Sequence, residues 1–205
     1  MNWLARSACA EPLMGAMDWP CQLEWNSIMP VLNIPFGLSV LGAFLASTVV
    51  AYTYVWPVLR ALPRYDALRL LAVFNAFRFL GMNFMVSGFV SPALDSSFAS
   101  QIGWGDFIAA ILALLSMAAL SWRWAVAIPI VWIFNVWGAL DLLNAYYVGV
   151  TQMPDPGLLA AGIYIPALYV PLLLVSHTLI FVLLARSHSL QQAAAKHGGI
   201  AGAAP

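Results

Sequence analysis

Five long runs of apolar residues, joined by short polar segments, make up most of this sequence. A helix needs about 20 apolar residues to cross a hydrocarbon core of about 30 Å, because it rises about 1.5 Å per residue. The runs are apolar on all faces, so they predict helices rather than the alternating strands of a membrane barrel. The sequence therefore predicts an all-α, polytopic membrane helix bundle with five transmembrane helices, at about 34–59, 70–92, 102–122, 124–150 and 158–185.

Composition supports this class of protein. Hydrophobic residues make up 63% of the 205 residues and charged residues only 8%, whereas a soluble domain has about 25% charged residues. We therefore expect the lipid bilayer to surround the chain. Eight Lys and Arg balance eight Asp and Glu, so the chain has no basic field with which to bind nucleic acid.

Positive residues are unevenly divided between the two sides of the expected bundle. Lys and Arg are enriched in cytoplasmic loops, and here six lie on one side, whereas the other side has Arg6 together with most of the acidic residues. This predicts an N-terminus outside, a C-terminus in the cytoplasm, and a multi-pass protein of the bacterial inner (cytoplasmic) membrane. The six are Arg60, Arg64, Arg69, Arg123, Arg186 and Lys196.

The segments at the two ends differ from the apolar runs. Residues 1–33 lack the continuous apolar core of a signal peptide, and their tryptophans suit an outer arm at the membrane interface. Cys9 and Cys21 on this arm are either a disulfide or two free thiols. Residues 34–186 form the predicted transmembrane domain. The Ala- and Gly-rich segment 187–205 is expected to be a flexible cytoplasmic tail.

Three charged residues interrupt the apolar runs: Arg78, Asp106 and Asp141. Each charge at the centre of a membrane helix costs roughly 2.5–3.5 kcal/mol, so each needs a partner, water or a function. A guanidinium does not deprotonate. Arg78 is therefore either half of an ion pair that fixes the helix register, with Asp141 or Asp106, or part of a site that binds an anion or gates proton movement.

Asp106 lies in the motif GWGDF, close to the expected start of the third helix. An aspartate in the first turn of a helix caps free backbone N–H groups and interacts favourably with the helix dipole. We expect this capping role for Asp106, at the outer interface.

Polar residues accompany the charges at helical spacing. Asn75 shares a stripe with Arg78, and Asn83 stands about 80° away from that stripe. In the fourth run, the motif NVWGALD places Asn135 near Asp141, with Gly138 between them. A glycine there allows another backbone or a ligand to approach closely.

His177 lies in the fifth run, after Pro166 and Pro171. Each proline removes a backbone donor and leaves a carbonyl free one turn earlier. We expect either one hydrogen bond from His177 across the bundle or a single-histidine ligand to a pigment or haem. A bis-histidine haem is excluded, because no other histidine lies in an apolar run. The sequence identifies no cofactor.

Motifs of catalysis are missing. The chain has no cysteine pair with metal-binding spacing, no HExxH and no GxSxG. We therefore predict no catalytic residue and no metal ligand, and we favour a protein that is not an enzyme.

Several ionisable residues within one bundle favour a non-enzymatic integral membrane protein with a buried polar site. We expect this site to bind a small ligand, lipid or ion, and we expect its role to be related to transport. One alternative is an accessory or structural subunit of a larger membrane complex. Another is a lipid- or isoprenoid-modifying enzyme that uses Asp141 or His177 as acid or base. We expect a homo-oligomer or other membrane subunits as partners. The candidate ligand-binding residues are Arg78, Asn75, Asn83, Asn135, Asp141, His177 and Asp106.

Overall fold

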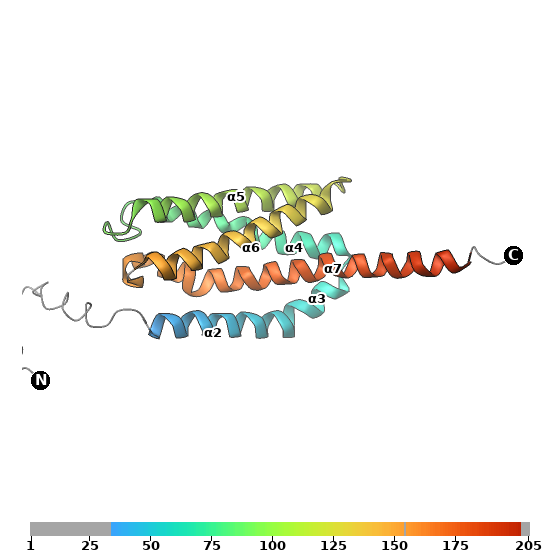
Figure 1. Ribbon diagram of the computed structural model, residues 1–205, viewed down its shortest axis with the longest axis horizontal. Coiled ribbons are helices and arrows are strands. Elements are labelled where there is room, and N and C mark those ends of the chain that lie inside the picture. The colour runs from blue at the N-terminus through green and yellow to red at the C-terminus, as the bar shows by residue number, and fades with distance from the viewer. Residues whose placement is uncertain (1–33, 154, 202–205) are drawn as a thin grey trace, which may run out of the picture. The chain divides into compact units, whose positions relative to one another are not determined.

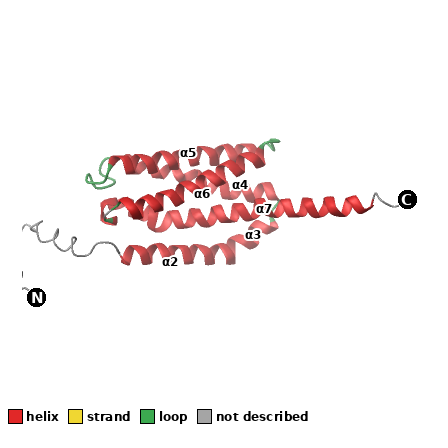
Figure 2. Cartoon of the chain, viewed as in Figure 1, coloured by secondary structure: helices red, strands yellow, loops and turns green. Residues whose placement is uncertain are grey.

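A computed structural model describes residues 34–153 and 155–201, and it gives residues 187–201 as helical backbone. The described chain is built from helices and their connections (Figure 2). The predicted outer arm, including Cys9 and Cys21, lies outside the described residues. The segment expected to be a tail continues the last helix as far as Ala201.

The described part of the chain contains five helices that are long and apolar enough to cross a membrane, as the sequence predicts. Two are continuous α-helices and three contain a segment of different pitch (Figure 1). In chain order they are α2 (Ile34–Val50), η2 (Ala51–Val55) and α3 (Trp56–Ala61); α4 (Arg64–Ala76) and η3 (Phe77–Met85); α5 (Ser96–Ser121); α6 (Ala127–Gln152); and η5 (Ile165–Tyr169) with α7 (Val170–Ala201), preceded by the short 3₁₀ helix η4 (Pro156–Ile163).

The start of α5 corrects one prediction. Asp95 caps this helix, because its carboxylate accepts a hydrogen bond from the Ser97 backbone N–H at 3.0 Å. The helix therefore begins at Ser96, and the glycines of GWGDF lie inside it. The prediction that Asp106 caps the helix is wrong: Asp106 lies about three turns from the N-terminus.

Two of these five helices contain a π-helical segment, and in each a proline follows shortly after it. Segment η2 ends at Val55 and Pro57 follows; segment η5 ends at Tyr169 and Pro171 follows. Proline has no N–H for the carbonyl one turn earlier, so the regular α-helical bonding is interrupted there. The prolines therefore account for the change of pitch in both helices.

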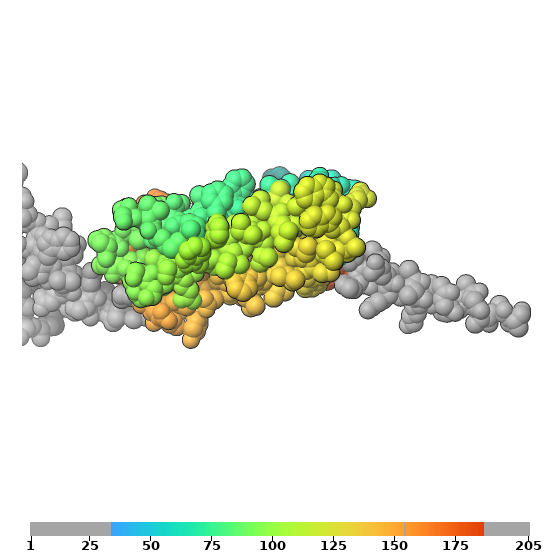
Figure 3. All heavy atoms as spheres, turned by 90° about the horizontal axis from the view of Figure 1, so that it is seen from above, coloured from blue at the N-terminus to red at the C-terminus, as the bar shows by residue number. Residues whose placement is uncertain are grey.

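The buried core lies between α4, α5, α6 and α7. Helix α5 packs against α4, η3 and α6, and these helices form the face seen in Figure 3. Small residues allow this close packing, since Ala109 and Ala113 of α5 are fully buried. Helix α2 packs mainly against α7 and η5. The large side chains of the main core include Leu59, Leu68, Phe134, Ile180 and Leu184.

Candidate functional site

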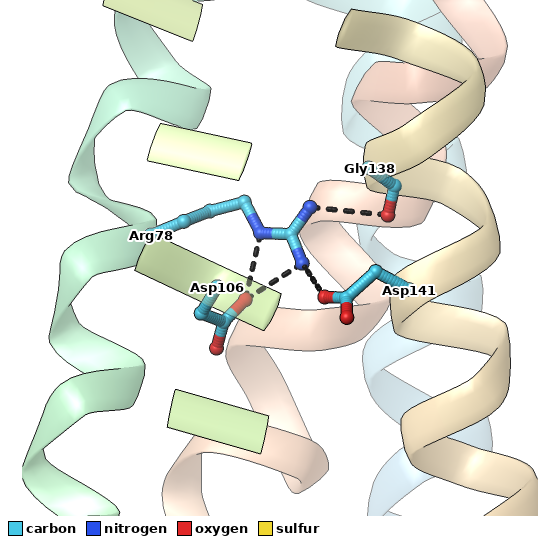
Figure 4. A network of polar contacts seen from close by, with 4 residues as sticks. All are labelled: Arg78, Asp106, Gly138 and Asp141. Carbon is cyan, nitrogen blue, oxygen red and sulfur yellow. Dashed lines mark hydrogen bonds and ion pairs between the residues drawn. The ribbon is translucent and has the colours of Figure 1, made fainter. Parts of the chain in front are cut away.

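The guanidinium of Arg78 is fully buried and lies at the centre of a charged cluster. Its Nη2 lies 2.6 Å from Asp106 Oδ1 and 2.6 Å from Asp141 Oδ2. Its Nε donates to Asp106 Oδ1 at 2.8 Å, and its Nη1 donates to the Gly138 carbonyl at 3.0 Å. Figure 4 shows these contacts. The protein itself therefore supplies partners to all three nitrogens of the guanidinium.

Three helices bring these charges together. Arg78 lies at the start of η3, Asp106 lies in α5, and Gly138 and Asp141 lie one turn apart on α6. Each charge comes from a different helix, so the cluster fixes how η3, α5 and α6 are positioned along one another. Arg78 thus pairs with both aspartates, where the sequence suggested one or the other.

Glycines make room for this cluster. A Cβ on Gly81 or Gly105 would overlap the carboxylate of Asp106 or Asp141 respectively. A Cβ on Gly138 would lie 2.6 Å from His177 Cε1 and 2.9 Å from Arg78 Nη1. Such distances are well below ordinary van der Waals contact, so none of the three positions accepts a larger residue without movement.

Sequence reasoning missed two of these glycines. Gly81 follows Arg78 by three residues, on the same helical face, and that spacing is the signal that could have identified it. Gly105 shares a row of small residues with Ala109 and Ala113, which predicts close helix packing, but the motif GWGDF places it at the helix start, whereas it lies within α5 beside Asp141.

A second polar contact joins α6 to α7. Asn135 Nδ2 donates to the His177 carbonyl at 3.2 Å, and Asn135 Oδ1 lies 2.7 Å from His177 Nδ1. Because an amide oxygen only accepts, Nδ1 must carry the hydrogen and donate it. In the neutral ring, Nε2 is then an acceptor, and this buried atom has no hydrogen-bond partner among the described residues.

The position of His177 Nε2 bears on the expected pigment or haem. A Cβ on Gly138 would lie 2.8 Å from this atom and 2.9 Å from Arg78 Nη1, so His177 Nε2 and the guanidinium are close neighbours. A metal ion held there would meet a cation next to it. The geometry therefore favours the other expectation, in which His177 makes a hydrogen bond across the bundle.

The remaining asparagines lie in different settings. Asn75 Nδ2 donates to Ser176 Oγ at 2.8 Å and to the Leu71 carbonyl at 2.9 Å, so it joins α4 to α7. Asn83 is half-buried and takes no part in the contacts around Arg78. Within residues 34–153 and 155–186, no three His, Cys, Asp or Glu side chains are placed to hold a metal ion.

We expect Asn135→Leu to lower the free energy of unfolding by about 1–3 kcal/mol, because it leaves His177 Nδ1–H and a buried carbonyl without partners. Denaturant unfolding in detergent, followed by tryptophan fluorescence, measures this. Thr151→Val on the same helix is the control, since the Thr151 hydroxyl bonds to the Tyr147 carbonyl at an exposed position. Equal effects of the two substitutions would contradict the expectation.

The fold and the cluster together define the class of protein. The described chain is an all-α bundle in which five helices are long and apolar enough to cross a membrane, and the bundle encloses a buried group of charges. The model of a protein family described as a domain of unknown function (DUF8737) matches residues 35–185, and the chain belongs to that family. No curated protein and no solved structure matches the chain.

Proposed function

We propose that this chain is a non-enzymatic, multi-pass protein of the bacterial inner membrane whose buried polar site binds an ion. The ion is a proton or a small monovalent cation. The observation that carries the proposal is the charge of the buried cluster: one guanidinium faces two carboxylates. An uncompensated carboxylate is costly at low dielectric, so the cluster attracts one further positive charge.

The ends of the bundle support a membrane orientation with the C-terminus in the cytoplasm. Three arginines lie at the end of the bundle where α7 continues toward the C-terminus (Figure 1): Arg60 in the last turn of α3, Arg64 at the start of α4 and Arg123 between α5 and α6. Asp95 and Asp155 lie in the connections at the opposite end. Positive residues mark the cytoplasmic side of membrane proteins.

The bonding of Arg78 argues for a cation rather than an anion as the ligand. An anion would have to displace Asp106 or Asp141 from hydrogen bonds of 2.6–2.8 Å. The second oxygens, Asp106 Oδ2 and Asp141 Oδ1, take no part in these bonds. They are therefore the atoms that would accept a proton or coordinate a cation. The Asp141 side chain is 18% exposed and that of Asp106 9%, so Asp141 is the more accessible of the two.

Infrared spectroscopy of the protein in lipid tests this proposal. We expect the C=O stretching band of one protonated carboxyl group at neutral pH, and we expect Asp141→Asn to remove it. If sodium is the ligand instead, the band appears only when sodium is replaced by choline. Asp95→Asn, at the helix cap, is the control and leaves the band unchanged. Two ionised carboxylates in both salts would contradict the proposal.

A second candidate function is that of a subunit in a homo-oligomer or a larger membrane complex. It rests on how little of the first span, Ile34–Ala61, is covered by the rest of the chain. In the most apolar stretch of this span 11% of the residues are buried, whereas the corresponding share is 33% to 44% in the other four spans. A partner helix packed on α2 would explain this difference. Native mass spectrometry of protein extracted gently from its membrane distinguishes a homo-oligomer from a complex with other chains.

A further inference from the structure

A groove of about 430 Å³ runs between the first and the last span, apart from the charged cluster. Its walls are almost entirely apolar. One wall belongs to α2, η2 and α3 and includes Phe44, Thr48 and Trp56; the other belongs to α7 and includes Leu174, Thr178 and Val182.

The groove exists because of how these two spans run. Helices α2 and α7 lie side by side and run in the same direction (Figure 1). The π-helical segment η2 and Pro57 interrupt the regular pitch of the first span beside the groove. Such an interruption alters the direction in which successive side chains point, so the first span does not follow α7 closely along its whole length.

A positive charge lies at one end of this groove. The Arg186 guanidinium lies over the Trp56 ring, 4.5 Å from its centre, and Trp56 is itself a wall residue. Leu179 and Val182 of the wall precede Arg186 on one face of α7, at helical spacing. The same stripe of the helix is therefore apolar along the groove and cationic where the groove ends.

Most other charges at this end are also positive. Arg60 is exposed at the end of α3. Arg64 donates to the Leu184 carbonyl of α7 at 3.4 Å, and its buried Nε has no hydrogen-bond partner among the described residues. Asp66 is the acidic residue of the described chain at this end, and it pairs with Arg69 at 3.1 Å.

We propose that this groove binds an anionic phospholipid, with one acyl chain between α2 and α7 and the phosphate beside Arg186. Charge complementarity is the argument: an alkyl chain needs no hydrogen bond from the apolar walls, and the phosphate meets guanidinium groups, which hydrogen-bond phosphate well. The proposal rests on the membrane insertion and orientation proposed above. That orientation puts Arg186 at the cytoplasmic leaflet, where anionic lipids lie.

Native mass spectrometry of the full-length protein in mild detergent, with equal amounts of phosphatidylglycerol and phosphatidylcholine, tests the proposal. We expect the wild-type protein to retain phosphatidylglycerol preferentially. Arg186→Gln should reduce this preference about five-fold, because it removes the guanidinium that lies beside the phosphate in the groove. Arg186→Lys should keep most of it. Arg123→Gln is the matched control, since Arg123 lies at the same end of the bundle but outside the groove, and it should leave the preference unchanged.

A second variant tests the groove itself. Thr178 is an exposed wall residue, so Thr178→Trp fills the groove without disturbing the core, and we expect it to reduce retention of both lipids. Equal retention of the two lipids by the wild-type protein would overturn the proposal, as would a lipid-free dimer or competition by inorganic phosphate alone.

Carbonate extraction of native membranes separates the two proposals. If the chain is extracted, membrane insertion itself fails; if the chain stays in the membrane but lacks lipid preference, only the groove proposal fails.

Discussion

Replacing Arg78 with leucine should destabilise the protein more than any other single substitution in the bundle. The change leaves Asp106 and Asp141 facing each other without the guanidinium that now bonds to both. Removing one partner of a buried ion pair costs about 3–5 kcal/mol, because the charge that remains is uncompensated. Unfolding in detergent, followed by tryptophan fluorescence, should show a loss of this size or a failure to fold.

The triple variant Arg78→Leu, Asp106→Asn, Asp141→Asn keeps the experiment informative if the single variant does not fold. It removes all three charges, and we expect it to recover most of the lost stability, since an ion cluster replaced as a whole leaves no buried charge. Arg69→Leu is the matched control: it breaks an exposed pair with Asp66 and should cost at most about 1 kcal/mol.

Two results would contradict this account of the cluster. If Arg78→Leu unfolds like Arg69→Leu, the buried pairs contribute no more than an exposed one. If the triple variant is as unstable as the single one, the loss comes from packing around the Arg78 side chain rather than from unpaired charge. Recovery of stability together with loss of the protonated carboxyl band would separate the role of the cluster in folding from its role in ion binding.

The five helices could be predicted from the sequence because each depends on a property of its own segment. Length decides whether a helix reaches across the hydrocarbon core, and apolar composition decides whether its side chains are stable there. Neither requires knowledge of the neighbours. The ends of the helices were less predictable. The third was expected to start near 102, and it starts at Ser96 because Asp95 caps it.

This difference explains why the site was predicted only in part. With the third helix expected to start near 102, Asp106 falls in its first turn, where capping of the helix accounts for its charge without Arg78. In the structure Asp106 is buried and pairs with Arg78. Which aspartate Arg78 contacts depends on the packing of η3, α5 and α6 together, and no single segment contains that information. The hydrogen bond of Asn75 to Ser176 joins residues 101 positions apart and was missed for the same reason.

The glycines around the cluster lead to the second large effect. We expect Gly138→Ala to lower the free energy of unfolding by about 1–3 kcal/mol, the usual cost of inserting an extra methyl group into a packed core. The new Cβ would lie 2.6 Å from His177 Cε1, 2.8 Å from His177 Nε2 and 2.9 Å from Arg78 Nη1. Both side chains are held by hydrogen bonds to other groups, so neither moves away without breaking them.

Gly149→Ala is the matched control, because it makes the same chemical change on the same helix. A Cβ on Gly149 would meet no atom within 4 Å. In a helix, alanine is more favourable than glycine by up to about 1 kcal/mol, so this variant should be as stable as the wild-type protein or more stable. The two substitutions should thus shift stability in opposite directions, as measured by denaturant unfolding in the same detergent. Equal shifts would mean that α6 tolerates a methyl group beside Arg78, and that the glycine is not what allows the guanidinium to reach the Gly138 carbonyl.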